Sequence, residues 1–485
     1  MSAVLQALDE RRRAAPGALL AAGDALLTAG DLADRVARWQ ERLRRHAPRV
    51  IASRLDNGPD WLALDLAIRA CGATHVPIPT FFSAAQADHS LNESGAELLV
   101  LAPSGEAAAA RAVDDYVLRT LAGSATRLPP ATACITYTSG TTGQPKGVCL
   151  DAATLEGVAA SLVAATAALR PRRHLCALPL ATLLEQVAGL YAPLLAGAEL
   201  ALPSLHELGW SGSGGLDLRR FMACIARYRP ESMILVPQML VGLVQAIEGG
   251  VPRPDSLRFI AVGGARVGSG LLARARQLGL PVHEGYGLSE CASVVCLQRP
   301  GGRGAAGVGP ALDHARIAIS ADGEVLVGGP RMLGYVGRER PAAGAWATGD
   351  LGRLDADGCL HITGRRRDVF ITAYGRNVSP EWVEAELLQH AAIAQAVVYG
   401  EARPWNVAVI VPARDDLPAS AIDRAVEAAN RGLPDYARIG AWVRAREPFH
   451  PGNGLGTANG RPRRAPIWQR HAAELDRLYE PATAS

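Results

Sequence analysis

The segment 135–147 combines residue types that suit the binding of a polyphosphate. It reads Ile-Thr-Tyr-Thr-Ser-Gly-Thr-Thr-Gly-Gln-Pro-Lys-Gly, and it overlaps the end of a strand-like apolar run. Glycines let a backbone approach a phosphate closely, hydroxyl groups donate hydrogen bonds to its oxygens, and lysine adds a point charge. It is not a Walker A loop, because proline precedes the lysine and glycine follows it. The segment predicts a phosphate-binding loop, and a flexible surface loop is the alternative.

Lys146 is the only lysine in a chain that otherwise uses arginine as its basic residue. The sequence contains 50 Lys and Arg residues, and all but this one are arginine. Arginine replaces a surface lysine at little cost, whereas a site that needs a compact ammonium group does not accept a planar guanidinium group. The position of this lysine beside the glycines therefore indicates a functional site rather than chance survival.

Three later segments carry residues that suit a nucleotide. The first, Ala261–Ala265, places two glycines after a strand-like run, where a flat ring could approach the backbone. The second, His283–Glu290, reads His-Glu-Gly-Tyr-Gly-Leu-Ser-Glu, and the third, Trp346–Asp350, reads Trp-Ala-Thr-Gly-Asp. Taken singly, such segments are also found as turns, as core packing or as a charged helix start.

Together these segments resemble the motifs of the adenylate-forming superfamily. This superfamily contains acyl-CoA synthetases, aryl-CoA ligases, nonribosomal-peptide adenylation domains and beetle luciferase, and the chain looks most like bacterial fatty acyl-CoA synthetases. The likeness covers nearly the whole chain, with the motifs in the family's order. It implies that ATP activates a carboxylic acid as an acyl-AMP, which then passes to a thiol as a thioester. The implied cofactors are ATP, Mg²⁺ and CoA, or a phosphopantetheine carrier such as an acyl carrier protein.

The resemblance also implies roles for individual residues. Lys146, Glu290 and Arg461 take the catalytic positions, and Glu290 is also the expected metal ligand, since Mg²⁺ prefers carboxylate oxygen. The residues expected to bind the nucleotide and its phosphates are Thr138, Ser139, Gly140, Thr141, Thr142, Gly143, Gly264, Ala265, Gly285, Tyr286, Ser289, Asp350 and Arg365.

Further positions are implied for the acid, the hinge and the thiol. The acyl pocket and its gate are expected at Thr182, Val236 and Gly263, the hinge at Arg367 and the thiol tunnel at Gly375. The Thr182 position often carries histidine or an aromatic residue in the family, so the gate departs from the usual pattern.

A second departure lies near the C-terminus, where Arg461 stands in place of the family's lysine. That lysine bridges the carboxylate and AMP during adenylation. Arginine keeps the positive charge, but it is longer and planar. We expect activity to be retained, and the alternative is a degenerate member that binds nucleotide with little turnover.

The segments around the motifs predict an α/β fold. Strand-like runs are expected at 50–55, 97–101, 134–138, 232–236, 257–262 and 281–284. They alternate with helical patterns at 32–45, 61–71, 154–169, 183–195, 238–248 and 270–278. This alternation is typical of largely parallel sheets covered by helices. Asp-Gly turns at 322–323 and 357–358 add a small antiparallel β unit.

We place a domain boundary in the polar stretch Gly364–Asp368. Residues 1–366 form the expected N-terminal AMP-binding (adenylation) domain, with a first subdomain, 1–130, that looks trimmed between about 102 and 131. Residues 367–485 form the expected C-terminal lid, a small mobile α+β domain with strands at 393–399 and 405–411 and helices at 380–389 and 419–430.

The composition excludes several classes of protein. The net charge of +3 on a 485-residue chain gives no basis for expecting nucleic acid or an anionic membrane as partner. No apolar stretch reaches the roughly 20 residues of a membrane helix, and no signal peptide is visible. The eight cysteines show no CxxC pair or Cys/His metal spacing. We expect a cytoplasmic protein without an integral membrane segment, as a monomer or homodimer.

The residues around the expected pocket limit the class of carboxylic acid that could be the substrate. Segment 178–190 has no aspartate to pair with an α-amino group, and a buried unpaired ammonium is costly, which argues against an amino acid substrate. Segments 182–186, 232–240 and 262–266 are mostly apolar. They predict a medium- or long-chain fatty acid as substrate, with an aryl acid or a carrier-protein-loading reaction as the alternatives.

Overall fold

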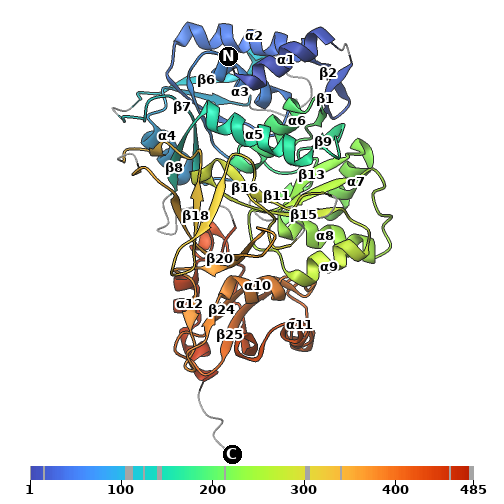
Figure 1. Ribbon diagram of the computed structural model, residues 1–485, viewed down its shortest axis with the longest axis vertical. Coiled ribbons are helices and arrows are strands. Elements are labelled where there is room, and N and C mark those ends of the chain that lie inside the picture. The colour runs from blue at the N-terminus through green and yellow to red at the C-terminus, as the bar shows by residue number, and fades with distance from the viewer. Residues whose placement is uncertain are drawn as a thin grey trace, which may run out of the picture.

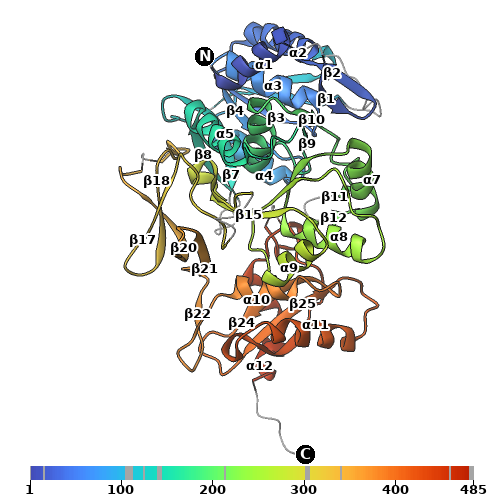
Figure 2. The ribbon, with the colours of Figure 1, turned by 45° about the vertical axis from the view of Figure 1, so that its right-hand side comes forward.

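The computed structural model describes residues 2–14, 17–103, 113–123, 126–138, 145–211, 215–300, 306–338, 341–457 and 460–479. Two helix-covered sheets fill the upper part of the molecule in Figure 1, and the C-terminal unit lies at the opposite end. A smaller sheet stands beside the first two and reaches toward the C-terminal unit, as Figure 2 shows from another side. The α/β class expected from the sequence is confirmed.

The first sheet carries the predicted phosphate loop between two of its strands. Its order is β19-β8-β7-β4-β3-β5-β6. The strands are β3 Val50–Arg54, β4 Thr74–Pro77, β5 Leu98–Leu101, β6 Val117–Thr120, β7 Thr132–Thr138, β8 Lys146–Asp151 and β19 Gly334–Tyr335. Strands β7 and β8 are antiparallel, and Thr138 pairs with Lys146 at the mouth of the loop. The register therefore fixes where the loop begins and ends.

The second sheet supplies the strand ends that face the first. Its order is β16-β15-β14-β13-β9-β10-β1-β2, and the pairs from β15 to β1 are parallel. The strands are β1 Ala18–Ala22, β2 Ala25–Thr28, β9 Arg173–Leu175, β10 Glu199–Ala201, β13 Ser232–Leu235, β14 Phe259–Val262, β15 Val282–Leu288 and β16 Ser293–Leu297. Parallel strands place their carboxyl ends at one edge, where ligands bind in open α/β sheets.

Helices cover these sheets. They are α1 Ala3–Ala14, α2 Ala29–His46, α3 Pro59–Ala70, α4 Ala84–Ser94, α5 Ala152–Thr166, α6 Ala192–Leu195, α7 Leu218–Tyr228, α8 Pro237–Glu248 and α9 Ser269–Gln277. Helix α2 shows why they form, since Thr28 and Asp31 make a capping box and Leu32, Val36 and Trp39 are buried at helical spacing. Helix α3 is buried along almost its whole length, so it lies inside the N-terminal core.

The expected helix at 183–195 differs from the observed backbone. Residues Glu185–Tyr191 form a π-helix, η2, and only α6 continues as an α-helix. The Gly189 carbonyl accepts a hydrogen bond from Cys176 Sγ at 3.2 Å, so a side chain outside the helix contacts its backbone. A wider π-turn is a recurring feature near functional sites, and a hydrophobic periodicity of 3.6 does not reveal it.

The remaining strands form smaller sheets. The antiparallel sheet β17-β18-β20-β21 consists of Arg316–Ile319, Glu324–Gly328, Trp346–Leu354 and Leu360–Arg365. The C-terminal unit contains β24 Ile393–Tyr399, β25 Asn406–Pro412 and β26 Ile439–Arg444 with α10 Pro380–Leu387, α11 Ala419–Arg431 and α12 Arg464–Arg477. Short ribbons pair β11 Trp210–Ser211 with β12 Gly215–Leu216 and β22 Phe370–Ile371 with β23 Asn377–Val378. The small antiparallel unit predicted from the Asp-Gly turns at 322–323 and 357–358 is thus present.

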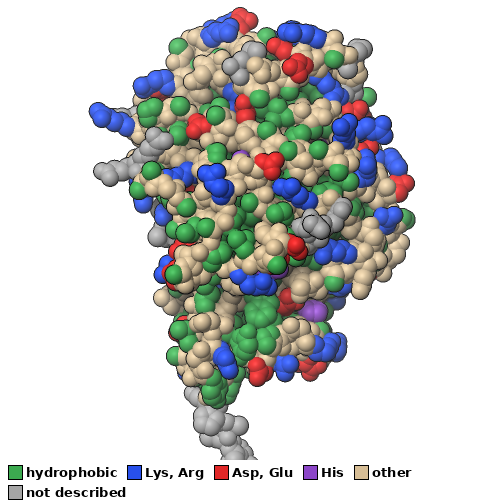
Figure 3. Space-filling view, viewed as in Figure 1, with side chains coloured by type: hydrophobic (Ala, Val, Ile, Leu, Met, Phe, Trp, Pro, Cys, Tyr) green, Lys and Arg blue, Asp and Glu red, His purple; other side chains and the backbone are tan. Residues whose placement is uncertain are grey.

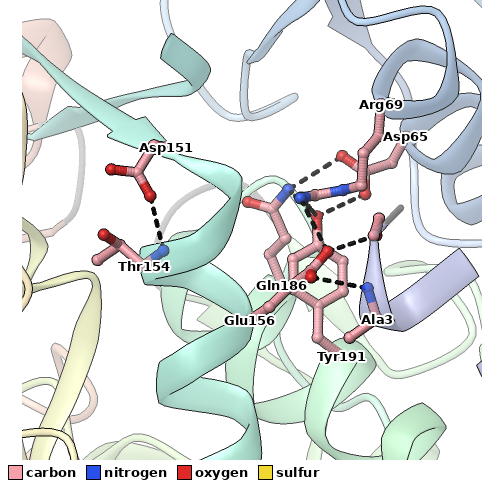
Figure 4. A network of polar contacts seen from close by, with 9 residues as sticks. Ala3, Asp65, Arg69, Asp151, Thr154, Glu156, Gln186 and Tyr191 are labelled. Carbon is pink, nitrogen blue, oxygen red and sulfur yellow. Dashed lines mark hydrogen bonds and ion pairs between the residues drawn. The ribbon is translucent and has the colours of Figure 1, made fainter. Parts of the chain in front are cut away.

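A buried polar network joins α3, η2 and β4, and Figure 4 shows its members on α3 and η2. Asp65 accepts hydrogen bonds from Tyr191 at 2.6 Å, from His75 Nδ1 at 2.7 Å and from Gln186 at 3.0 Å. Arg69 donates to the Tyr191 hydroxyl at 2.7 Å. Burial raises the pKa of Asp65, but His75 and Arg69 outweigh it and hold that pKa below its usual value. The network fixes the elements that border the site.

Within the described residues, no helix combines the length and apolar character needed to cross a bilayer. On the face drawn in Figure 3, basic side chains are spread among acidic ones and do not merge into one basic patch.

Asp65→Asn is expected to lower the free energy of unfolding by about 3–5 kcal/mol, because it removes the charge that a buried arginine faces. The folded-state pKa of Asp65 is lowered, so its contribution is present at neutral pH and lost as pH falls through that pKa. Denaturant unfolding of both proteins at several pH values measures this, and the two should converge in acid. Asp24→Asn, in an exposed ion pair with Arg227, should change little. Equal stability at neutral pH would contradict the prediction.

Candidate active site

One cavity of about 750 Å³ lies where both large sheets, the small sheet and the C-terminal unit meet. Most of the site residues expected from the sequence line it. These are Thr138, Lys146, Thr182, Gly263, Gly264, Gly285, Tyr286, Ser289, Glu290, Asp350, Arg365, Arg367 and Arg461. Residues separated by more than 300 positions in the chain therefore share one space.

Other expected site residues lie elsewhere. Val236 is half-buried behind Gly264 and does not line the cavity, and Ala265 is exposed beside it. Gly375 lies in an exposed turn with φ of +72° and also lies outside the lining. The five residues from the middle of the expected phosphate loop lie outside the described residues. These are Ser139, Gly140, Thr141, Thr142 and Gly143.

Lys146 and Glu290 meet through a residue that the sequence reasoning missed. The ammonium group of Lys146 lies 5.9 Å from the centroid of the Tyr335 ring. The Tyr335 hydroxyl donates to Glu290 Oε1 at 2.8 Å. Burial, followed by the charge of Glu290, raises the pKa of Tyr335, so this group stays a donor at neutral pH. One aromatic side chain therefore positions both a cation and a carboxylate.

No local pattern marks Tyr335. Tyr335 lies in β19, a strand of two residues, and pairs with Val148 of β8, which lies almost 190 positions earlier in the chain. In the sequence, Tyr335 is marked only by its position after the Asp-Gly turn at 322–323, and that position does not indicate a role in a site. Its role follows from a long-range strand pairing.

Tyr286 and Asp350 form the opposite wall of the cavity. The Tyr286 hydroxyl donates to Asp350 Oδ2 at 2.6 Å, and Arg365 Nε lies 3.2 Å from Asp350 Oδ1. Burial and then the Asp350 charge raise the pKa of Tyr286. The Asp350–Arg365 pair comes from a strand register, since the two residues face each other across β20 and β21. The Tyr286–Asp350 hydrogen bond joins two different sheets. A carboxylate held between a phenol and a guanidinium group suits the hydrogen bonding of a sugar's hydroxyls.

Arg461 reaches the cavity from the C-terminal unit. Its guanidinium group donates to the Gly264 carbonyl at 2.9 Å, at the edge of the second sheet. Asp350, Arg365 and Glu381 lie close enough to interact with its charge. The substituted residue therefore occupies the cavity together with Lys146 and does not point away from it.

Around α9 and α10, the N-terminal part of the chain contacts the C-terminal unit through polar groups. Ser269 donates through its amide and its hydroxyl to Glu386 at 3.3 Å. Arg266 lies 5.9 Å from the Trp382 ring, and burial lowers the pKa of its guanidinium group. Burial also raises the pKa of the adjacent Glu284 to about 7. Polar interfaces of this kind are compatible with relative motion.

The far end of the cavity is mostly apolar. Its walls come from α5, η2 with α6, and the second sheet, and they include Leu162, Val163, Ala188, Ala192, Ala198 and Phe259. Thr182 also lines the cavity, and its hydroxyl donates to the Pro179 carbonyl at 2.7 Å. Small alanine side chains leave space along this wall, so the cavity combines a polar end with an apolar recess.

Comparison with known proteins shows which family this chain resembles over most of its length. Residues 8–336 match the family model described as AMP-binding enzyme, and residues 367–483 match the model of the AMP-binding enzyme C-terminal domain. A long-chain-fatty-acid–CoA ligase of Mycobacterium bovis is 29% identical over 439 residues, which cover 72% of this chain and 71% of the relative. A feruloyl-CoA synthase of an Amycolatopsis species is 30% identical over 428 residues, covering 81% and 84%.

A solved structure shares the architecture. It is the o-succinylbenzoate CoA synthetase of Bacillus subtilis in complex with its acyl-adenylate intermediate, with a TM-score of 0.75 and 25% identity, covering 95% of this chain and 97% of that one. The same enzyme has been solved with ATP and magnesium ion, at a TM-score of 0.74 and 25% identity, covering 95% and 98%.

Gly287→Ala should destabilise the strand turn that carries Tyr286 and Ser289. A Cβ atom at residue 287 would lie 1.6 Å from the Ser293 carbonyl oxygen, so β15 and β16 would have to separate. We expect a loss of at least about 1–3 kcal/mol in the free energy of unfolding, measured by denaturant titration. Gly157→Ala in α5, with open space around the new methyl group, should be neutral or stabilising by up to about 1 kcal/mol. Similar unfolding curves for both variants would refute this reading of the turn.

Proposed function

We propose that this chain, which belongs to the AMP-binding enzyme family, activates an apolar carboxylic acid with ATP and transfers the acyl group to the thiol of CoA. At the level of reaction class, the chain is an AMP-forming acid–CoA ligase of this family. The observation that carries the proposal is the single cavity in which Lys146, Glu290, Asp350 and Arg461 meet beside an apolar recess. ATP and the acid can then lie side by side.

The polar end of the cavity suits ATP and its metal. Thr138 and Lys146 bracket the phosphate loop, and we propose that the loop between them cradles the polyphosphate. Tyr286 and Asp350 are assigned to the adenosine part of the nucleotide. The Glu290 carboxylate, held by Tyr335, fits a Mg²⁺ ion shared with phosphate oxygens, because Mg²⁺ is commonly bound by one or two carboxylates together with phosphates. When bound, Mg²⁺ would offset phosphate charge.

In the first half-reaction, a carboxylate oxygen of the acid attacks the α-phosphorus of ATP and pyrophosphate leaves, which gives acyl-AMP. No protein nucleophile is needed, so catalysis rests on positioning and on cationic groups around the phosphates. Lys146 supplies one cation from the N-terminal side. Arg461 supplies another across the domain interface, where it lies against Gly264.

In the second half-reaction, the thiolate sulfur attacks the acyl carbon and AMP leaves. We propose that residues 1–366 and 367–485 are the units that move, with Arg367 as hinge. The polar contacts between Ser269 and Glu386 support this division, because polar contacts separate at little cost. Rotation would withdraw Arg461 and bring the exposed turn at Gly375 toward the cavity to line a thiol tunnel.

The acid is assigned by the recess. Its walls of leucine, alanine, valine and phenylalanine suit a medium- or long-chain fatty acid, and a plain aryl acid is the second candidate. Named relatives act on long-chain fatty, ferulic and o-succinylbenzoic acids, so both candidates have precedents in the family. AMP release measured with a panel of fatty and aryl acids, with CoA and a holo-carrier protein offered in parallel, separates these options.

Lys146→Ala should reduce acid-dependent ATP–pyrophosphate exchange by about 10²–10³-fold, because a charge on the phosphates is lost. Lys146→Arg should fall between the variant and the wild type, since a guanidinium group restores charge without the compact geometry. Arg414→Ala, which breaks only an exposed ion pair with Asp416, is the control and should exchange normally. Exchange at the wild-type rate in Lys146→Ala would remove the basis of the proposal.

Arg461→Ala should impair only the first half-reaction. We expect acid-dependent exchange to fall at least about tenfold, because one phosphate-facing cation is lost, whereas thioester formation from supplied acyl-AMP stays near the wild-type rate. Arg461→Lys should retain or raise exchange, since both residues are cationic. An equal loss in both half-reactions would argue that Arg461 serves folding or domain docking instead. Normal exchange in Arg461→Ala would leave Arg461 without the proposed role.

A further inference from the structure

A second cluster of reactive side chains lies at the end of β9 and the start of η2. Among the described residues, His174, Cys176 and Glu185 are the three whose ligand-type atoms all lie within 4.8 Å of one another. All three are buried, and Glu185 has no exposed surface. No step of the proposed reaction uses them. Only His174 of the three also lines the cavity, so the cluster lies directly behind its wall.

Within this cluster, His174 and Glu185 face each other without a hydrogen bond between them. His174 Nε2 lies 4.0 Å from Glu185 Oε1, which is too long for a hydrogen bond. That nitrogen and both Glu185 oxygens are buried without a partner in the described part of the chain. Buried polar groups are nearly always paired, so several unpaired ones in one place indicate that a binding partner belongs between them.

The histidine is oriented as a ligand would be. Its other ring nitrogen, Nδ1, lies 2.9 Å from the Ser232 hydroxyl on the neighbouring strand β13. With Nδ1 as the donor, the lone pair of Nε2 points toward Glu185 and Cys176. Metal-binding histidines are usually fixed in this way by a hydrogen bond on the second nitrogen.

The charges of the three groups balance a divalent cation. Burial lowers the pKa of His174 to about 3, so its ring is neutral. Burial raises the pKa of Glu185 and that of Cys176 well above their usual values, so both hold protons while the cluster stands alone. A thiolate, a carboxylate and a neutral imidazole together carry the charge that one divalent ion neutralises.

The local backbone leaves room for this arrangement. Gly189 lies one turn after Glu185 in η2, and a Cβ atom there would lie 2.5 Å from Glu185 Oε1. Only glycine therefore lets the carboxyl group turn back toward β9. The π-turn and Gly189 together aim Glu185 at His174 of β9 and at Cys176 just after it, and this explains a backbone irregularity that the hydrophobic pattern does not require.

We propose that His174 Nε2, Cys176 Sγ and a Glu185 carboxylate oxygen bind a zinc ion. Zinc accepts nitrogen, sulfur and oxygen ligands in a tetrahedral arrangement, and side-chain rotations of about 1 Å bring the three atoms to the required spacing. On binding, the thiol and the carboxylic acid each release a proton, so two positive charges enter and two leave.

This ion would tie the wall of the acid recess to the second sheet. Leu184 directly precedes Glu185 in the sequence, and Ala188 follows it by three residues. Both line the cavity. Fixing Glu185 to β9 would hold them in place. The site is distinct from the expected Mg²⁺ ligand Glu290, because it offers sulfur and nitrogen, whereas Mg²⁺ prefers oxygen.

Zinc content and a cobalt spectrum test the proposal on the purified full-length chain. After incubation with zinc and removal of excess, the wild type should hold about one zinc ion per chain. Cys176→Ser and Glu185→Gln should each hold at least about tenfold less. Cys224→Ser is the matched control, because Cys224 is also buried and its thiol likewise donates to a backbone carbonyl at 3.2 Å. It should bind zinc as the wild type does.

Cobalt(II) in place of zinc adds a readout that does not depend on activity or on stability. A thiolate ligand gives an intense sulfur-to-cobalt absorption band, expected in the wild type and in Cys224→Ser and absent in Cys176→Ser. Should a variant not fold, the wild-type spectrum alone decides. A wild type without zinc and without this band, or equal zinc in Cys176→Ser, would overturn the proposal and leave a neutral Glu185 beside a buried water.

Discussion

The pairing of three antiparallel strands, β7, β8 and β19, is the constraint on which the site depends. The pair Thr138–Lys146 fixes the register of β7 against β8, and a shift of β8 by one residue would move the lysine to the other face of the strand. Pairing of β19 with β8 then brings the Tyr335 ring close to the lysine ammonium group and the Tyr335 hydroxyl to Glu290. A single ribbon therefore sets the distance between the cation and the carboxylate that must share a phosphate chain.

The two large sheets hold this ribbon against the strand ends that carry Tyr286. Asp65 is the point where they are joined, because its carboxylate takes hydrogen bonds from β4 of one sheet and from η2, which packs against the other. Such a buried charge is costly unless its lone pairs are used, and here three donors come from two elements, β4 and η2. The network therefore favours one relative placement of the sheets, and the cavity between them inherits it.

Local motifs could be identified from the sequence, and long-range partnerships could not. The glycine loop, the Tyr286 segment and Asp350 are contiguous strings whose chemistry is visible in their residue types. Tyr335 was missed because its importance comes from pairing with a strand almost 190 positions earlier. The His174, Cys176 and Glu185 cluster was missed for a related reason. The spacing of two β9 residues indicates little until a π-turn directs a carboxylate at them, and hydrophobic periodicity cannot distinguish a π-turn from an α-helix.

The two cationic positions explain why one lysine remains while another position carries arginine. Lys146 projects from a strand edge toward the face of Tyr335, where a compact ammonium group lies 5.9 Å from the ring centroid. Arg461 extends from the C-terminal unit to the Gly264 carbonyl, where a longer side chain with several donors can contact the backbone of the other unit. In the proposed reaction, the same replacement is therefore costly inside the sheet and tolerable across the interface between the two units.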